Sequence, residues 1–574
     1  MTIFTGAISL RPNHALSDDL LAALRANVSR KPDDQRIEAS GTGFFVTSVD
    51  IGAFGAPGML RDDSGNITLV AGEPLLPEGE SNDRWNRADD LAVLHPRLAT
   101  GDTGVLQRCR GTYCGLHFSA ASGALTLFVD RVGVRPLYLW VGKDVAVFST
   151  ALRVLEALPM VRKEFDLRGV AEITTFGFPL SDRTAYLGIN MLKSGQLVRI
   201  AGGQVTRALY ARWDGKLDTS TPHQQTVERA YAEFIKAIRR RHRDHKVAAA
   251  FLSGGLDSRV IVGGLHANGS DVYTVNYAPD GSQDQVFAAL VAKQLGIHYT
   301  QIETNADNVS QGYRKDAVNR WLKETFAGSG GQSPLVWSGD GGSVGLGHVY
   351  LTRAIADAMQ RGDLEQAISF FTTGVAGGVI KRKMRSAVSG LPMQGVKEEL
   401  QQIESADGGR RFHIFLMQND QRRHLARHFE DIDLERIEFQ LPFFDADFLE
   451  SVMRLPNEPL MFHHFYMDWL ACFPNALNAI AWQAYPGHVP CELPTPPGLK
   501  YQWDEYYDKK MYRQMRHAAA RQGMGMLTDA NFPGHIVSKP SLAAAVLLTR
   551  LGVRDYTYLI RTASVFHQYW KAAR

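Results

Sequence analysis

Ser253-Gly254-Gly255-Leu256-Asp257-Ser258 is the stretch that decides the fold of the second half of this chain. The apolar run before it, 247–252, predicts a buried strand, and residues 259–265 after it predict a helix. Glycine lets the backbone approach an oxyanion closely, and a helix N-terminus presents free N–H groups and positive dipole. The stretch therefore predicts an anion cradle. No Gly-Lys-Ser/Thr follows it, so the pattern is not a Walker loop.

Strands and helices alternate around this turn. The expected strands cover 247–252, 272–277, 299–302 and 335–337. The expected helices cover 224–243, 259–265, 283–295 and 309–325. This alternation predicts a parallel, doubly wound sheet, in which ligands bind at the carboxyl ends of the strands. The remainder, about 351–574, is expected to be mostly helical.

The first 210 residues have a different pattern, with short apolar runs separated by Gly, Asn and Asp turns. Runs such as 43–46, 67–70 and 125–129 predict strands, and 197–205 predicts a hairpin. Helices are expected at 16–28 and 89–98. We therefore expect two domains, 1–210 and 211–574, in a chain of α/β plus α+β class.

Composition excludes several classes of protein. The 574 residues contain 63 Lys and Arg against 60 Asp and Glu, which gives no general case for nucleic-acid or membrane binding. No apolar run approaches the roughly 20 residues that span a bilayer. The first residues lack the pattern of a secretory signal, and the four cysteines form no Cys-x-x-Cys pair. These features predict a cytoplasmic protein.

The run Arg239-Arg240-Arg241-His242-Arg243 ends the expected helix 224–243. We expect a solvated helix end, since cations are favoured at a helix C-terminus. A nucleic-acid contact is the alternative that the run suggests.

A glycine-dense segment, 338–348, follows the strand expected at 335–337 and should lie on the same sheet edge as the cradle. Its only acid, Asp340, is interpreted as a magnesium ligand or a base, and a flexible surface turn is the alternative. His424 and His428, four residues apart, lack a carboxylate or cysteine set that would complete a metal site.

Glu438 stands between apolar residues in Glu435-Arg436-Ile437-Glu438-Phe439-Gln440-Leu441-Pro442-Phe443-Phe444-Asp445. Burying an acid is costly unless it is paired. Glu438 is therefore expected either in a salt bridge or in a site, and its sequence alone leaves both open.

Taken together, these segments resemble the class B asparagine synthetase superfamily. Residues 253–258 match its pyrophosphate loop, 338–343 match a later loop in part, and 438–445 match a third motif. Asp130-Arg131-Val132-Gly133-Val134-Arg135-Pro136-Leu137-Tyr138 matches its N-terminal domain. The resemblance implies an Ntn-hydrolase-like, glutaminase-like β-sandwich over 1–210. It also implies a pyrophosphate-loop α/β synthetase domain with a helical extension over 211–574.

The departures from the family bear on activity. Thr2 stands where the family has its nucleophilic cysteine, and the Arg-Leu-Ser-Ile and Asn-Gly-Glu segments that would hold glutamine are not found. A thiolate attacks an amide far more readily than an unassisted hydroxyl. The first domain is therefore expected not to release ammonia. Ser343 and Val344 replace an Asp and a Glu, and Gln440 replaces an Arg.

The resemblance also implies a site for ATP and Mg²⁺. Metal ligation is expected from Asp257 and Asp340, and catalysis from Glu438 as base, with Asp340 as the other candidate. Lys500 is expected over the phosphates, with Lys539 as its competitor. Asp284 is expected near the nucleotide or, alternatively, as a helix N-cap. The expected ATP-binding residues are Leu252, Ser253, Gly254, Gly255, Leu256, Asp257, Ser258, Val275, Tyr277, Asp284, Ser338 and Gly339.

Within the superfamily, residues 339–348 look more like the lasso-peptide cyclases than the β-lactam synthetases, which carry a Tyr at the position of Asp340. This resemblance implies adenylation of an Asp or Glu side chain, attack by the peptide's N-terminal amine, and release of AMP and pyrophosphate. A precursor peptide, a leader peptidase and a leader-binding protein are the implied partners. The alternatives are a β-lactam-synthetase-like or ammonia-dependent asparagine-synthetase-like enzyme, a non-catalytic ATP-binding regulator, and a tRNA-modifying enzyme.

Overall fold

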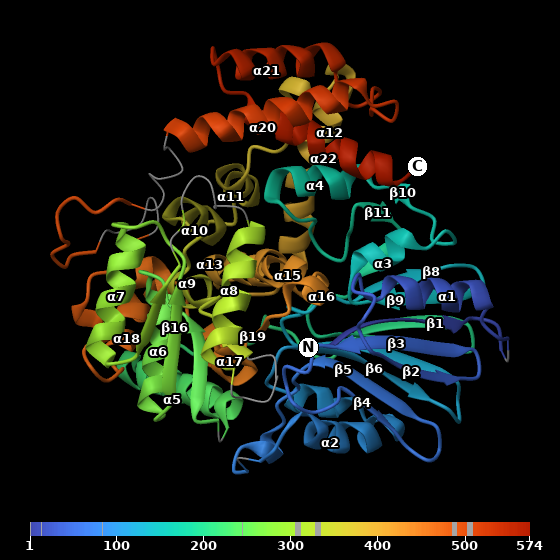
Figure 1. Ribbon diagram of the computed structural model, residues 1–574, viewed down its shortest axis with the longest axis horizontal. Helices are drawn as coiled ribbons and strands as arrows, with labels where there is room; N and C mark the ends of the chain where they lie inside the picture. The colour runs from blue at the N-terminus through green and yellow to red at the C-terminus, as the bar shows by residue number, and fades with distance from the viewer. Residues whose placement is uncertain are drawn as a thin grey trace.

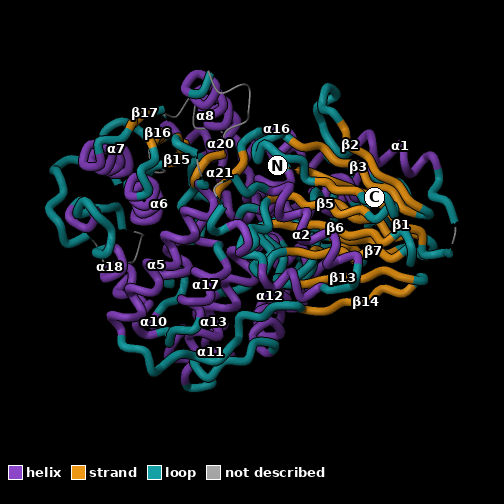
Figure 2. The backbone as a smooth tube through the Cα atoms, turned by 90° about the horizontal axis from the view of Figure 1, so that it is seen from below, coloured by secondary structure: helices purple, strands orange, loops and turns teal. Residues whose placement is uncertain are grey.

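The computed structural model describes residues 2–12, 14–82, 84–243, 245–302, 304, 311–327, 335–484, 491–501 and 509–574. Figure 1 shows the antiparallel strands of the first half on the right, a parallel sheet on the left and the C-terminal helices above. The tube in Figure 2 separates the same parts, with the strands of the first half gathered at one end and the parallel strands among helices at the other.

Two six-stranded antiparallel sheets form the first half. One has the order β12 (Ile189–Met191), β8 (Tyr138–Val141), β9 (Val145–Ser149), β1 (Thr2–Ser9), β3 (Phe44–Asp50), β2 (Arg36–Gly41). The other has the order β14 (Gln204–Leu209), β13 (Gln196–Ala201), β7 (Ala124–Val129), β6 (Tyr113–Ser119), β5 (Ile67–Gly72), β4 (Met59–Arg61). Their inner faces share one apolar core, in which Phe44 stacks on Phe118 with ring centroids 4.3 Å apart. The predicted β-sandwich is confirmed.

Helices cover both outer faces of this sandwich. Leu20 and Leu24 of α1 (Asp18–Asn27) pack with α3 (Leu152–Ala157) on the sheet that contains β1. On the sheet that contains β5, α2 (Arg87–Ala99) buries Leu91, Leu94 and Leu98. The helices α1 and α2 confirm those expected at 16–28 and 89–98.

The second half contains a five-stranded parallel sheet in the order β17 (His298–Gln301), β16 (Asp271–Asn276), β15 (Val247–Phe251), β18 (Leu335–Trp337), β19 (Glu438–Gln440). Ala248 and Ala250 face the core with α5 (His223–His242), α6 (Leu256–Ala267) and α7 (Gln283–Leu295). Ala249 faces the opposite core with α8 (Gln311–Thr325). The doubly wound sheet is therefore confirmed, and the part of the expected helix before residue 311 lies outside the described residues.

The strand β19 was not predicted. Residues 335–337 were expected to end the sheet, but β19 pairs with β18 in parallel after about a hundred residues of intervening helix and loop. A strand of three residues is too short for alternation to reveal it. Its position brings Glu438 to the sheet.

Helices of the C-terminal stretch pack on the first half. The helices α20 (Lys509–Thr528), α21 (Lys539–Leu551) and α22 (Thr557–Ala572) form one layer, and α22 contacts α4 (Leu167–Phe176). The same core cluster includes Val170 of α4 and Phe566 of α22. In the part of the chain that the structure describes, no helix combines the length and apolar character needed to cross a bilayer.

Candidate nucleotide and acyl-transfer site

The cradle predicted at 253–258 lies between β15 and α6. The side chain of Ser258 accepts a hydrogen bond from the Ser253 N–H at 2.9 Å, and Asp284 accepts one from the Gly254 N–H at 2.9 Å. A Cβ atom on Gly254 would lie 2.7 Å from the Asp284 Cα, so glycine is required there. Because the first N–H groups of a helix have no intrahelical partner, α6 offers donors to an anion at this end.

Asp284 holds the cradle from the next strand–helix unit. Besides Gly254, it accepts a hydrogen bond of 3.0 Å from the side-chain amide of Asn276 at the end of β16. The N-cap of α7 is Ser282, whose hydroxyl accepts from the Gln285 N–H. The alternative interpretation of Asp284 as an N-cap is therefore wrong, and Asp284 supports the loop in which an anion would lie.

The loop after β18 packs directly on the cradle. A Cβ atom on Gly342 would lie 2.5 Å from the Asp257 Oδ1. Asp257 accepts hydrogen bonds from the N–H (2.9 Å) and hydroxyl (2.8 Å) of Ser343 and from the hydroxyl of Tyr466 (2.9 Å). Burial raises the pKa of Asp257 to about 6, despite these donors. Ser343, which replaces an acid of the family, is thus a donor that orients Asp257.

The segment 338–348 is not a flexible surface turn. Residues 342–347 form a short helix, α9, and every one of them is buried. The expectation that this segment shares a sheet edge with the cradle is confirmed, since β15 and β18 are parallel neighbours.

Asp340 forms an ion pair with a histidine that the sequence did not connect to it. The His424 Nε2 lies 3.3 Å from the Asp340 Oδ1, and the Ser338 hydroxyl donates to the Asp340 Oδ2. The hydrogen bond to Asp340 raises the pKa of His424. Burial opposes ionisation of Asp340, but His424 holds its pKa below the ordinary value. The pair is a partly exposed ion pair beside the cradle.

Glu438 lies in a buried salt bridge. Its Oε1 accepts from the Arg135 Nη2 at 2.8 Å and from the Phe439 N–H at 2.9 Å, and its side chain is 0% exposed. Arg135 belongs to the first half, where it also donates to the Thr112 carbonyl at 2.8 Å. Of the two alternatives left open by the sequence, the salt bridge is the one observed. It joins the two motifs at 130–138 and 438–445 across the halves.

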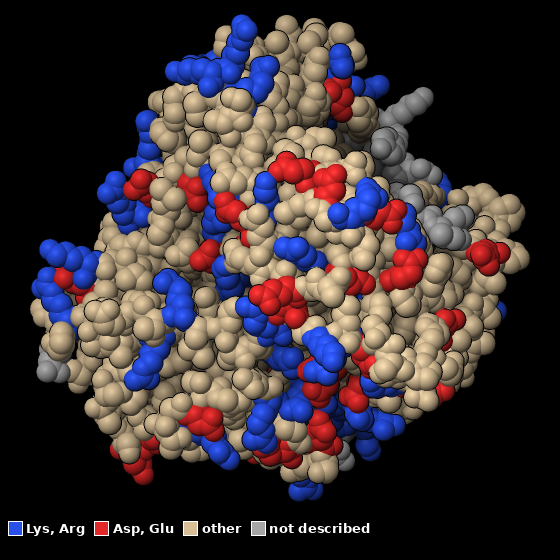
Figure 3. Space-filling model, turned by 180° about the vertical axis from the view of Figure 1, so that it is seen from behind, with Lys and Arg blue, Asp and Glu red and all other residues tan. Residues whose placement is uncertain are grey.

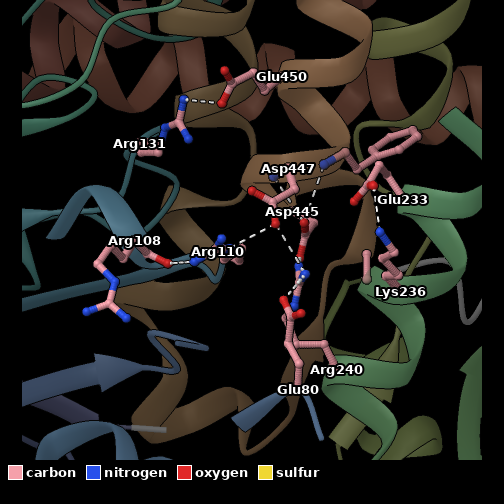
Figure 4. Close-up of polar contacts among 12 residues, drawn as sticks. Glu80, Arg108, Arg110, Arg131, Glu233, Lys236, Arg240, Asp445, Asp447 and Glu450 are labelled. Atoms are coloured by element: carbon pink, nitrogen blue, oxygen red, sulfur yellow. Dashed lines mark hydrogen bonds and ion pairs between the residues drawn. The ribbon is translucent and has the colours of Figure 1, made fainter. Parts of the chain in front are cut away.

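The cationic run 239–243 is also part of this junction, contrary to the expected solvated helix end. Arg240 and Arg241 are buried, and each lies 2.6 Å from Asp445. Figure 4 shows Arg240 between Asp445 and Glu80, with Arg110 reaching Asp447 from the first half. Arg240 and Arg241, which suggested a nucleic-acid contact, thus form ion pairs with carboxylates of the protein itself, and these come from both halves.

The two candidate lysines lie in different places. The backbone of Lys500 contacts the start of α7, where its carbonyl accepts from the Gln283 N–H at 2.8 Å, and its side chain is exposed. Lys539 begins α21, and its ammonium lies 5.1 Å from the centroid of the Phe532 ring. Lys500 is thus the lysine anchored next to the unit that contains Asp284.

The expected adenine contacts differ in exposure. Leu252 and Val275 are buried in the cores on opposite faces of the sheet, so only their backbone atoms can meet a nucleotide. Tyr277 is partly exposed and packs edge-on against Phe251 with ring centroids 5.8 Å apart.

Sequence reasoning missed Gln483, which closes the other side of the cradle. The Gln483 N–H donates to the Gly254 carbonyl at 3.0 Å, and its buried side-chain amide finds no hydrogen-bond partner among the described residues. Arg259 of α6 anchors this segment by donating to the carbonyls of Leu477, Ile480 and Ala481. No motif around Gln483 signals this contact, because only the folded segment brings it to the loop.

The position expected for a glutaminase nucleophile holds a buried polar cluster. The Thr2 hydroxyl donates to the Asp50 Oδ2 at 2.7 Å, and Arg87 donates to the same oxygen at 2.6 Å. Arg87 is fully buried and lies over the Phe54 ring at 5.1 Å. The hydroxyl of Thr2 is therefore engaged with a carboxylate beside a buried guanidinium.

Glu430 at the junction gives a pH-dependent prediction. It accepts from the Tyr138 hydroxyl at 2.6 Å and from the Leu152 N–H, and burial raises its pKa from an ordinary value of 4.5 to about 7. Because the native state holds this proton more tightly, the free energy of unfolding should fall as the pH rises from about 4.5 to 7. Glu430→Gln should therefore raise the melting temperature at pH 8 and change it little at pH 4.5. Calorimetry at both pH values tests this, and an equal shift at both would contradict it.

The chain joins an antiparallel sandwich to a parallel α/β sheet whose glycine cradle lies between β15 and α6. Comparison with known families matches a different domain in each half. The glutamine amidotransferase domain family matches residues 78–211, and the asparagine synthase family matches residues 230–337. Part of each half of the chain is thus similar to one of these two domain families.

Similar proteins share only part of their length with this chain. A protein of Mycobacterium bovis, provisionally named as a glutamine-hydrolyzing asparagine synthetase, is 25% identical over 214 residues. That alignment covers 36% of this chain and 33% of the relative, and Mycobacterium tuberculosis proteins of the same name match equally. The chain thus spans about a third of the length of these relatives. Among solved structures, a glutamine phosphoribosylpyrophosphate amidotransferase from B. subtilis aligns at 12% identity and a TM-score of 0.25, over 59% of this chain and 82% of its own.

Proposed function

We propose that this protein forms an amide bond at the expense of ATP, by adenylating an Asp or Glu side chain of a peptide and closing a macrolactam of the lasso-peptide type. The observation that carries the proposal is the cradle at 253–258, which the loop of Asp340 and Ser343 packs against. A carboxylate is a poor acyl electrophile, so its conversion to an acyl adenylate, with pyrophosphate as the leaving group, makes the carbonyl reactive. Attack by the peptide's N-terminal amine then forms the amide and releases AMP.

The cradle residues fit an ATP and magnesium site. Asp257 and Asp340 lie on adjoining loops, and the charge of Asp340 raises the pKa of Asp257 further, after the larger effect of burial. Magnesium is commonly held by one or two carboxylates together with phosphate oxygens and water, so these two residues would suffice to hold it. When bound there, it would neutralise charge on the leaving pyrophosphate. The N–H groups of α6 would hold the phosphate oxygens.

Acid–base chemistry is better placed on Asp340 and His424 than on Glu438. Glu438 is enclosed and paired with Arg135, whereas the side chains of His424 and Asp340 are 50% and 25% exposed. An attacking ammonium must lose a proton before it can act as a nucleophile. We propose that His424 in its neutral form accepts this proton, directly or through water, and that the Asp340 carboxylate stabilises the imidazolium so formed. Glu438 is proposed to position the strand beside it.

The amine is proposed to come from the substrate itself. The Thr2 hydroxyl donates to Asp50 and lacks the reactivity of a thiolate, so glutamine is not expected to supply ammonia. Holding the amine and the activated carbonyl in one site can raise their effective concentration to the order of 10⁵–10⁸ M. A precursor peptide is then the substrate, and a leader peptidase and a leader-binding protein are further proposed partners. A β-lactam-type or ammonia-dependent reaction on a small amino acid remains the second candidate.

The test gives the purified chain ATP, magnesium and one of three amine sources. These are glutamine, ammonium with aspartate, and synthetic peptides with an N-terminal Gly and an Asp or Glu seven to eight positions on. We expect AMP and pyrophosphate with a peptide, together with a product that has lost one water by mass spectrometry. Glutamate release from glutamine would contradict the inactive first domain. Formation of ADP or orthophosphate would overturn the proposed chemistry. AMP formation in the arm with ammonium and aspartate, but not with a peptide, would select the second candidate.

A further inference from the structure

Four large apolar side chains protrude together at the end of α21 and the start of α22. Leu547 is 56% exposed, Leu551 64%, Val553 71% and Tyr558 56%, and these are the four highest exposures among the large apolar side chains that the structure describes. We call these four residues the α21 patch. The patch belongs to the outer layer of helices at the top of Figure 1.

The patch is the outward face of a helix whose other face is packed. Leu542, Val546 and Thr549 of α21 are buried against the layer, while Leu547 and Leu551 stand one turn apart on the outer side. Exposed side chains at a spacing of four residues form a stripe rather than scattered positions. Contiguous apolar surface of this kind marks interaction sites, whereas single exposed apolar residues are ordinary.

Three arginines are close to this stripe in the sequence. Arg550, Arg554 and Arg561 are exposed beside the patch, and none forms an ion pair with an acidic side chain of the described ranges. Over 509–574, Lys and Arg outnumber Asp and Glu by eleven to two, although the whole chain is nearly balanced at 63 to 60. Figure 3 shows blue side chains prevailing over red ones at the top of the molecule, where this layer lies.

We propose that the α21 patch is a docking site for an acidic polypeptide segment that presents apolar side chains between Asp and Glu residues. The charges are complementary, because each of these exposed guanidinium groups can take a carboxylate in a two-pronged hydrogen bond, and that of Arg554 also lies 5.3 Å from the centroid of the Tyr556 ring. The apolar stripe supplies the contact area, and the arginines at its sides select acidic partners. The stripe of Leu547 and Leu551 covers one turn of α21, which is small for insertion into a bilayer, since interfacial helices bury an apolar face along their length. The proposal does not depend on the reaction proposed above.

The test selects partners without assuming their sequence. A phage library of random 16-residue peptides is selected on the full chain after depletion on the triple variant R550E/L551S/R554E. The selected sequences should be acidic, with apolar residues three or four positions apart. A synthetic peptide of the most frequent sequence should bind the full chain at least tenfold more tightly than R550E/R554E or L547S/L551S, and added salt should weaken binding. The variants L290S and R427E, which change exposed residues on other elements, should bind like the unmodified chain.

Each other outcome overturns the proposal. Selected peptides without acidic excess, or with equal affinity for both patch variants, would leave the patch without this partner. If the chain binds no peptide but sediments with phosphatidylglycerol vesicles, and the patch variants do not sediment, the patch is assigned to a membrane. A dimer in light scattering that L547S/L551S dissociates would assign it to a second copy of the chain. Melting temperatures of all variants exclude loss of folding as the cause.

Discussion

Replacing Asp257 by Asn should reduce AMP formation by a factor on the order of a thousand, the scale seen when a group that stabilises developing charge is removed. Asn is nearly the same size and keeps an oxygen for the hydroxyls of Ser343 and Tyr466, but its NH2 group would face the Ser343 N–H, so the melting temperature of the variant is measured beside its activity. It loses the negative charge that a divalent cation requires. Pyrophosphate release in the presence of peptide substrate measures the effect.

A matched control uses a second aspartate near the same sheet edge. Asp280 precedes α7, is exposed and accepts a hydrogen bond only from Gln285 among the described residues. Asp280→Asn should leave AMP formation within about twofold, as is usual for surface substitutions. If Asp257→Asn retains near-normal pyrophosphate release, Asp257 has no role in ATP cleavage and the assignment of the cradle is wrong.

Replacing Arg135 by Met should destabilise the chain by about 3–5 kcal/mol, because it removes the guanidinium that neutralises the Glu438 carboxylate in a site where that side chain is 0% exposed. The guanidinium that now lies 2.8 Å from that carboxylate also stacks over the Phe429 ring at 4.4 Å. Methionine fills much of that space, so most of the loss should come from the uncompensated charge. The shift in the urea unfolding midpoint measures it.

The double variant R135M/E438Q distinguishes a lost charge pair from lost packing. Removing the charge of Glu438 should restore much of the stability, since a neutral amide in the same place costs less to bury. Equal destabilisation in the single and double variants would show that Arg135 acts only by packing. E438Q alone should lower the rates of adenylation and amide formation alike, because Glu438 is proposed to position its strand and not to accept the proton. A loss confined to amide formation would instead assign the base to Glu438.

How far the sequence predicts this protein depends on the distance between the residues concerned. The helix 283–295 and the strand 335–337 were predicted with the bounds that the structure has, because their apolar patterns are local. The cradle was predicted for the same reason, since two glycines between a strand and a helix permit few backbone conformations.

Contacts between distant segments were not predictable in this way. Arg240 and Arg241 were expected at a solvated helix end. They are buried, and Asp445, more than 200 residues later in the chain, lies 2.6 Å from each. The pairing of Asp340 with His424 and the approach of Gln483 to Gly254 depend likewise on how helices pack around the sheet.

The sequence by itself determined the two kinds of sheet, the glycine cradle and the acids that follow it, because hydrophobic period and backbone freedom act over a few residues. Only the tertiary structure decided which acids are paired, which arginines are buried and which apolar side chains stay exposed. The physical reason is that the cost of burying a charge, or of exposing a leucine, is set by neighbours that the chain supplies from hundreds of residues away.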